Sequence, residues 1–203
     1  MIKKIIATLL IGTSILVVSC DRSNKVEESE LQEKKIVSAT VSATQVMDKM
    51  EIDLVGVPTT KTNLPKRYEG VIDVGQSFAP NFETIASLTP DLLIIDINFK
   101  DKVKEQVKQY EMNTYYFDTT SFTNFKASII ELGELLDKKD ESGKVVDELG
   151  KSVEDVLKKG KKSNKKPKIA IVFGSAESYM LATDISYIGD LLNTIDVDNV
   201  TDS

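Results

Sequence analysis

Residues 40–68, TVSATQVMDKMEIDLVGVPTTKTNLPKRY, reveal more about the fold than any other part of the chain. They contain the end of a strand, a Ser/Thr loop, the start of a helix, a second strand, a second Thr-rich loop and a basic, aromatic segment. Hydroxyl groups and free backbone N–H groups at strand ends and helix starts attract carboxylates and phosphates. The stretch therefore predicts a rim that holds an anionic group rather than a catalytic triad.

Two loops carry this rim. Ser42 precedes the helical run ATQVMDKM, and the loop Thr59-Thr60-Lys61 follows the second strand. In an open α/β sheet, ligands bind outside the carboxyl ends of the strands, which is where both loops would lie. The alternative for Ser42 is that its side chain only caps the helix.

Outward from this stretch, strands and helices alternate, and compact apolar runs such as LLII are typical of buried strands. The pattern predicts an α/β fold with a mainly parallel sheet covered on both faces. The expected strands are 36–40, 54–57, 71–74, 92–95 and 114–117, and the expected helices are 43–50, 81–88 and 100–110.

Two amphipathic helices are predicted next. Apolar residues recur at helical spacing from Phe125 to Leu136, and again in a helix from Asp140 to Lys161, roughly 33 Å long. After the lysine-rich stretch 158–168 we expect a strand at 169–173 and a short strand at 179–182. A helix at 187–193 with Ser186 as its N-cap would follow.

The N-terminus has the features of an export signal. Lys3 and Lys4 precede an apolar run of residues 5–18, which is too short for a comfortable membrane span. Val-Val-Ser-Cys at 17–20 matches a bacterial lipobox, so residues 1–19 are predicted to be a signal peptide and Cys20 the lipid attachment site. The alternative is an ordinary signal peptide with an incidental cysteine. Residues 20–34 are polar and predict a flexible tether.

Charge and composition exclude several functions. Without Lys3 and Lys4 the chain has 24 basic and 32 acidic residues, a formal net charge of −8, which argues against nucleic acid as a partner. The chain contains no histidine, so it has neither a Ser-His-Asp triad nor the usual histidine metal sites. We therefore do not expect an enzyme.

The runs MDK, LVG-PTT, LPKRY, VGQSFAPNFETI, LTPDLL and YMLATDISYIGDLL resemble, in order and spacing, the haem-receptor lipoproteins of the iron-regulated surface determinant (Isd) system. These are substrate-binding proteins of ATP-binding-cassette (ABC) importers. The resemblance implies the class III periplasmic-binding-protein fold, with two α/β lobes bridged by a long helix. It implies an N-terminal lobe at 35–137, the bridging helix and basic linker at 138–166, and an incomplete, C-terminally truncated second lobe at 167–203.

The resemblance also implies a site for haem b, the transported ligand. The expected ligand-binding residues are Thr40, Val41, Ser42, Ala43, Thr59, Thr60, Lys61, Phe78, Tyr179 and Met180. Members of the family commonly have a methionine ligand to iron at the place of Phe78, which can stack on a porphyrin but cannot bind iron. Their histidine ligand would lie beyond Ser203. The iron ligands of this chain therefore stay open, with Tyr179 and Met180 as either ligands or lining residues.

The resemblance implies a haem receptor, anchored through Cys20 in the bilayer at the outer face of the cell membrane of a Gram-positive cell. Its expected partners are haem, an ABC permease and upstream surface haem-relay proteins. Two alternatives stay open: a receptor for another iron chelate or corrinoid, which Phe78 favours, and a degenerate surface lipoprotein without transport. If the second lobe is incomplete, apolar residues at 169–173 and 191–192 should be exposed.

Overall fold

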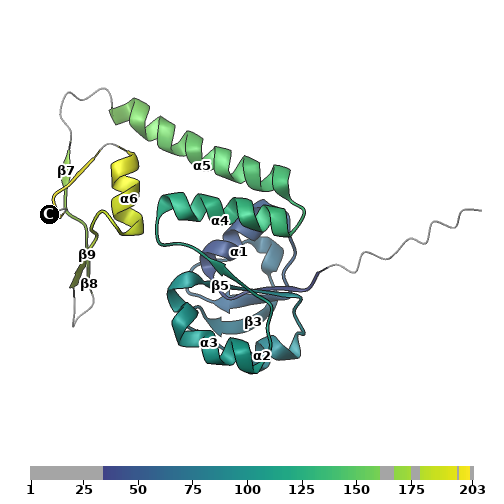
Figure 1. Ribbon diagram of the computed structural model, residues 1–203. Helices are drawn as coiled ribbons and strands as arrows, with labels where there is room; N and C mark the ends of the chain where they lie inside the picture. The colour runs from purple at the N-terminus through teal and green to yellow at the C-terminus, as the bar shows by residue number, and fades with distance from the viewer. Residues whose placement is uncertain (1–33, 161–166, 175–178, 196, 202–203) are drawn as a thin grey trace, which may run out of the picture. The chain divides into compact units, whose positions relative to one another are not determined.

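A computed structural model describes residues 34–160, 167–174, 179–195 and 197–201 (Figure 1). The expected signal peptide, Cys20 and all but the last residue of the tether lie outside the described residues. No helix in the described ranges is long and apolar enough to cross a bilayer.

A six-stranded sheet with the order β4-β3-β2-β1-β5-β6 forms the centre of the fold. All neighbouring strands run parallel except β3 and β4, which form an antiparallel pair. The predicted mainly parallel sheet is confirmed; β4, only two residues long, was not predicted. The strands are β1 (Ile36–Ser38), β2 (Gly56–Thr59), β3 (Ile72–Gln76), β4 (Ala79–Pro80), β5 (Leu92–Asp96) and β6 (Thr114–Phe117).

Helices cover both faces of the sheet. On one face lie α1 (Val41–Lys49), α4 (Phe122–Leu135) and α5 (Lys139–Gly160); on the other lie α2 (Phe82–Ser87) and α3 (Lys100–Gln109) (Figure 1). Successive strand side chains point to opposite faces, so Leu92 and Ile94 join the first core while Leu93 and Ile95 join the second. Two 3₁₀ turns, η1 (Lys66–Tyr68) and η2 (Ile97–Phe99), complete this region.

The long helix α5 packs closely on α4. A Cβ atom placed on Gly133 of α4 would lie 2.0 Å from the Oγ of Ser142, so only glycine permits this approach. The helix predicted at 140–161 is confirmed over its described residues and begins one residue earlier, while Lys161 lies outside the described residues. The lobe boundaries drawn from the resemblance remain predictions.

The C-terminal part consists of β7 (Lys168–Ile169), β8 (Val172–Gly174), β9 (Tyr179–Leu181), α6 (Tyr187–Thr194) and β10 (Asp198–Asn199). The single strand expected at 169–173 is wrong, because the chain pairs first with β10 in parallel and then, from Val172, with β9 in antiparallel. The predicted N-cap of α6 is confirmed: the Oγ of Ser186 accepts a hydrogen bond from the N–H of Gly189.

The exposed surface matches the expectation only in part. Val172 and Phe173 are exposed, as predicted, whereas Leu192 is 6% exposed and packs inward. The prediction for Leu192 is therefore wrong, because α6 turns this side chain away from solvent.

Candidate functional site

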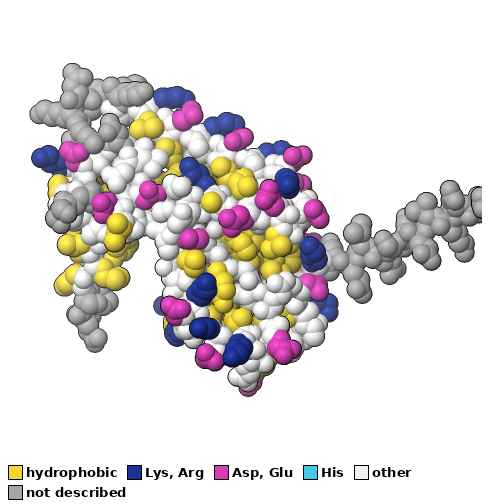
Figure 2. Space-filling view, in the orientation of Figure 1, with side chains coloured by type: hydrophobic (Ala, Val, Ile, Leu, Met, Phe, Trp, Pro, Cys, Tyr) yellow, Lys and Arg dark blue, Asp and Glu magenta, His cyan; other side chains and the backbone are white. Residues whose placement is uncertain are grey.

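A cleft of about 920 Å³ lies between the carboxyl ends of the sheet strands and the C-terminal segments. Figure 2 shows the molecule hollowed beside the β8–β9 hairpin, where hydrophobic side chains gather. The lining residues come from both sides of the cleft: Ser42, Gln45, Asp96, Asn98, Thr119, Thr120 and Phe125 on one, and Phe173, Met180, Ile185, Ser186, Tyr187 and Ile188 on the other.

The wall on the sheet side is polar and held by its own hydrogen bonds. One carboxylate oxygen of Asp96 accepts from the backbone N–H and the side-chain amide of Asn98, at 2.9 and 2.8 Å. The other accepts from the hydroxyl of Thr119, at 2.7 Å. Because both oxygens are engaged, Asp96 orders this wall rather than offering a free base. No described lining residue is Lys or Arg.

A chain of hydroxyl groups shapes the turn from β1 to α1, next to this wall. Thr44 donates to the Oγ of Ser38 and to the carbonyl of Thr40, both at 2.9 Å, and the Oγ atoms of Thr40 and Ser42 are 3.1 Å apart. Thr40 occupies the N-cap position, so the alternative that Ser42 caps the helix is wrong. Among the described residues, no acceptor meets the N–H groups of Val41 and Ser42.

The predicted rim residues in this turn differ in accessibility. Ser42 is half-buried and lines the cleft, and Val41 is half-buried. Thr40 is only 4% exposed and Ala43 is fully buried in the core, so in this structure Ala43 offers no surface to a ligand.

The second predicted loop lies at a different hollow. Thr59 and Thr60 line a hollow of about 560 Å³ beside the β2–β3 connection, which shares no lining residue with the cleft. Thr59 donates to a carboxylate oxygen of Asp73, and the hydroxyl of Thr60 accepts from the N–H of Thr62 at 3.0 Å. Lys61 is exposed and lines neither hollow. The structure therefore does not bring the two halves of the rim into one hollow.

Phe78 projects from the β3–β4 turn, and its side chain is 52% exposed. The ammonium group of Lys102 donates to the Phe78 carbonyl at 2.7 Å and lies 5.5 Å from the ring centroid. These two contacts from α3 hold the turn in place. Phe78 lines neither hollow.

The β8–β9 hairpin supplies part of the apolar wall. Phe173 and Met180 lie directly opposite each other in the ladder, and both line the cleft. Tyr179 and Leu181 flank Met180 along β9, so their side chains point to the other face of the hairpin. Tyr179 is 79% exposed and does not line the cleft.

Tyr187, the first residue of α6, connects the two walls. Its ring meets those of Phe122 and Phe125 edge-on, at centroid distances of 6.4 and 6.1 Å. Burial, and secondarily the nearby carboxylate of Asp190, raises the pKa of the Tyr187 phenol. Asp190 accepts a hydrogen bond from the N–H of Thr123 on α4.

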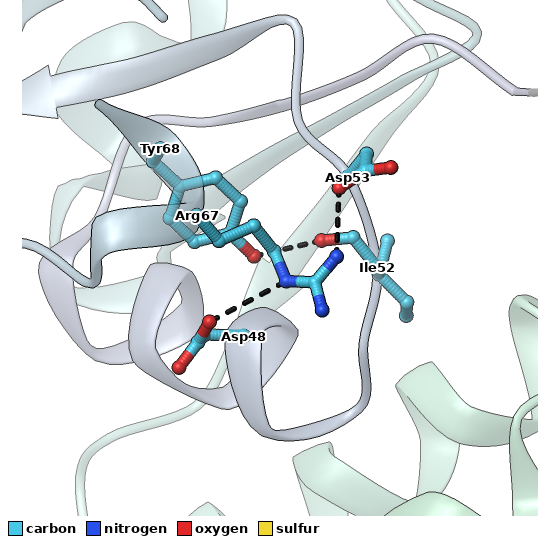
Figure 3. A network of polar contacts seen from close by, with 5 residues as sticks. All are labelled: Asp48, Ile52, Asp53, Arg67 and Tyr68. Carbon is cyan, nitrogen blue, oxygen red and sulfur yellow. Dashed lines mark hydrogen bonds and ion pairs between the residues drawn. The ribbon is translucent and has the colours of Figure 1, made fainter. Parts of the chain in front are cut away.

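The segment LPKRY has a structural role (Figure 3). Arg67 pairs with Asp53 at 2.9 Å and with Asp48 at 3.4 Å, and Tyr68 donates to the carbonyl of Ile52 at 2.7 Å. The hydrogen bond to Asp53 raises the pKa of Arg67, and burial raises the pKa of Tyr68. Arg67 is therefore committed to two carboxylates and ties this segment to the end of α1 and the loop that follows it.

Sequence reasoning missed the polar wall of Asp96, Asn98, Thr119 and Thr120, as well as Gln45 and the start of α6. The signal was present: Asp96 ends β5, and Thr119 and Thr120 follow β6. The strand-end rule that led to Ser42 and Thr59 applies equally to these two strands.

Comparison with known proteins matches most of the chain to one family. A family profile described as "Periplasmic binding protein" matches residues 36–203. The chain is similar to the high-affinity heme uptake system protein IsdE of Staphylococcus aureus, with 34% identity over 193 residues, covering 95% of this chain and 66% of the relative. It thus spans slightly less than two thirds of the length of this relative.

Two solved structures give the same picture. S. aureus IsdE complexed with heme matches with a TM-score of 0.78 and 34% identity, covering 84% of this chain and 66% of that one. An ABC transporter substrate-binding protein from Listeria monocytogenes EGD-e matches with a TM-score of 0.77 and 32% identity, covering 83% and 65%. These matches confirm the predicted α/β binding-protein fold.

Proposed function

We propose that this chain, which belongs to the periplasmic binding protein family, is an extracytoplasmic haem receptor. It would deliver haem to an ABC permease for iron acquisition. The relatives that support haem as the ligand are IsdE of S. aureus and its complex with heme. The chain would bind and release haem without changing it chemically.

The observation that carries the proposal is the cleft of about 920 Å³ with two unlike walls. Haem is a flat, apolar ring with two carboxylates on one edge. The ring would lie against Phe173, Met180 and Ile188, and such an apolar surface with a few polar groups is typical of small-molecule sites.

The propionates would point toward the start of α1. The N–H groups of Val41 and Ser42 have no acceptor among the described residues, and the N-terminal end of a helix favours negative charge. Asp96 lines the same wall as Ser42, but both of its carboxylate oxygens already accept hydrogen bonds from Asn98 and Thr119. We therefore assign the main propionate contact to Ser42.

The remaining predicted contacts come from residues that do not line the cleft. Thr59, Thr60 and Lys61 would take part only if a propionate extended beyond the cleft along the sheet edge, where Lys61 is exposed. Phe78, held by Lys102, would cover an edge of the ring.

The cellular context also belongs to the proposal. The lipobox at 17–20 supports lipid attachment through Cys20 and a place at the outer face of the cell membrane. A tethered receptor would take haem from surface haem-relay proteins and pass it to the permease. The lack of histidine and the engaged carboxylate of Asp96 support binding without catalysis.

Titration with ferric haem, followed by absorption in the Soret region, tests the proposal. We expect a saturable Soret shift at one haem per chain, and a rise in melting temperature because ligands that bind only the folded state stabilise it. A ferric siderophore and a cobalamin, as matched competitors, should produce neither effect. A rise in melting temperature with a competitor and no Soret change with haem would overturn the haem assignment.

A further inference from the structure

Few of the described residues that line the cleft can bind haem iron. Histidine, cysteine, methionine and tyrosine are the protein ligands of haem iron. The chain has no histidine, and its single cysteine lies outside the described residues. Among the described lining residues, only Met180 and Tyr187 belong to these types.

Tyr187 is poorly suited to bind iron. Tyrosine ligates haem as the phenolate, which requires loss of the phenolic proton. The ring is packed edge-on between Phe122 and Phe125, and Asp190 lies nearby on the same helix. Burial and this carboxylate both raise the pKa of the phenol, so it stays protonated at neutral pH.

Met180 differs from the other methionines in the described ranges. Met47 of α1 and Met50 at its C-terminal end are fully buried in the first core, and Met112 packs against the second core. Met180 is 67% exposed and lines the cleft opposite Phe173. Successive side chains of β9 point to opposite faces of the hairpin, so Met180 and Tyr179 cannot both face the cleft. Of these two candidate iron ligands, Met180 is the one that lines it.

We infer that Met180 binds the iron of haem in this cleft through its thioether sulfur, an inference that rests on the proposed haem-binding function. The sulfur donates a lone pair to iron, and no proton is released because a thioether carries none. Binding on this side of the ring should therefore not depend on pH through this group. Methionine ligation also raises the reduction potential of haem iron.

The experiment compares Met180→Leu with Met112→Leu, which removes a sulfur away from the cleft. Ferric haem is added to each protein, and the methionine-to-iron charge-transfer band in the near infrared is recorded. We expect the band in the wild type and Met112→Leu, and its complete loss in Met180→Leu. Met180→His, which offers a different iron ligand, should still bind haem but should lack this band.

Iron-free protoporphyrin IX separates a bond to iron from simple packing. Its affinity, measured by porphyrin fluorescence, should be equal within twofold in the wild type and Met180→Leu. A Met180→Leu protein that keeps the band would overturn the inference, as would an equal loss of affinity for haem and for the iron-free porphyrin in that variant. Absence of a Soret shift in the wild type would instead overturn the proposed function itself.

Discussion

The carboxylate of Asp190 on α6 accepts a hydrogen bond, 3.2 Å long, from the backbone N–H of Thr123, 67 residues earlier in the first turn of α4. This N–H has no partner within its own helix, and a negative charge at a helix N-terminus is stabilising. Together with the ring of Tyr187 against Phe122 and Phe125, the bond ties α6, which carries part of the cleft wall, to α4.

Asp190→Ala should lower the free energy of unfolding by about 1 kcal/mol, because α4 loses a capping acceptor. It should also weaken haem binding, since α6 carries part of the cleft wall. Urea denaturation and haem titration measure the two effects. Asp147→Ala, which removes an exposed carboxylate from α5, is the control and should change neither. Equal behaviour of the two variants would contradict the role of Asp190.

Gly133→Ala should destabilise the protein by about 1–3 kcal/mol, because the added Cβ collides with Ser142 where α4 and α5 meet. Gly150→Ala makes the same change on α5, where a Cβ meets no atom within 4 Å. This control should stabilise by about 0.5–1 kcal/mol, since alanine favours a helix more than glycine. Thermal melts of both variants test the prediction, and a stable Gly133→Ala protein would refute the close packing.

Tyr68→Phe should lose less stability than the wild type when the pH is raised into the alkaline range. The phenol of an unfolded chain titrates near pH 10, and burial raises the pKa of Tyr68 in the folded protein. Above pH about 10 the folded state therefore holds more protons than the unfolded state, so stability falls as pH rises. Below this pH the contribution is fully present.

Tyr68→Phe should also lower the free energy of unfolding by about 1 kcal/mol at neutral pH, because the carbonyl of Ile52 loses its hydrogen-bond donor. Denaturation curves between pH 7 and 11 measure both effects. If the free energy of unfolding falls with pH as steeply in Tyr68→Phe as in the wild type, the Tyr68 phenol does not contribute to the loss of stability at high pH.

Ser42→Ala keeps the N–H of residue 42 but removes the hydroxyl that would donate to a propionate. It should weaken haem binding about tenfold, because a hydrogen bond to a carboxylate contributes about 1.4 kcal/mol or more. Ser87→Ala, which removes a surface hydroxyl from the end of α2, should leave the affinity unchanged. Competition titrations with haem compare the variants. A loss of affinity in both, or in neither, would count against a propionate contact at Ser42.

Much of the fold follows from local sequence. Buried strands such as Leu92–Asp96 form continuous apolar runs, and α5 shows its helical period over many turns. The strands after residue 167 are harder to predict, because two or three residues carry no clear period. Their partners, β10 and β9, are set by tertiary packing rather than by local propensity.

The site was predicted less completely for a related reason. Ser42 and Met180 line the cleft, whereas Thr59 lies at another hollow, because adjacent strand ends can open in different directions. The sequence could not separate Met180 from Tyr179, since the face of a strand residue depends on its pairing with β8. Contact between haem and the ten predicted residues remains a prediction.

The most direct test of haem binding in this cleft is the haem dissociation constant of Ile185→Arg compared with Val200→Arg. Both side chains are exposed, 86% and 55%, so either charge should be tolerated by the fold, but only Ile185 lines the cleft. Haem binding in this cleft predicts at least about a tenfold weaker affinity for Ile185→Arg, equivalent to roughly 1.4 kcal/mol, and wild-type affinity for Val200→Arg. Wild-type affinity in both variants would contradict it.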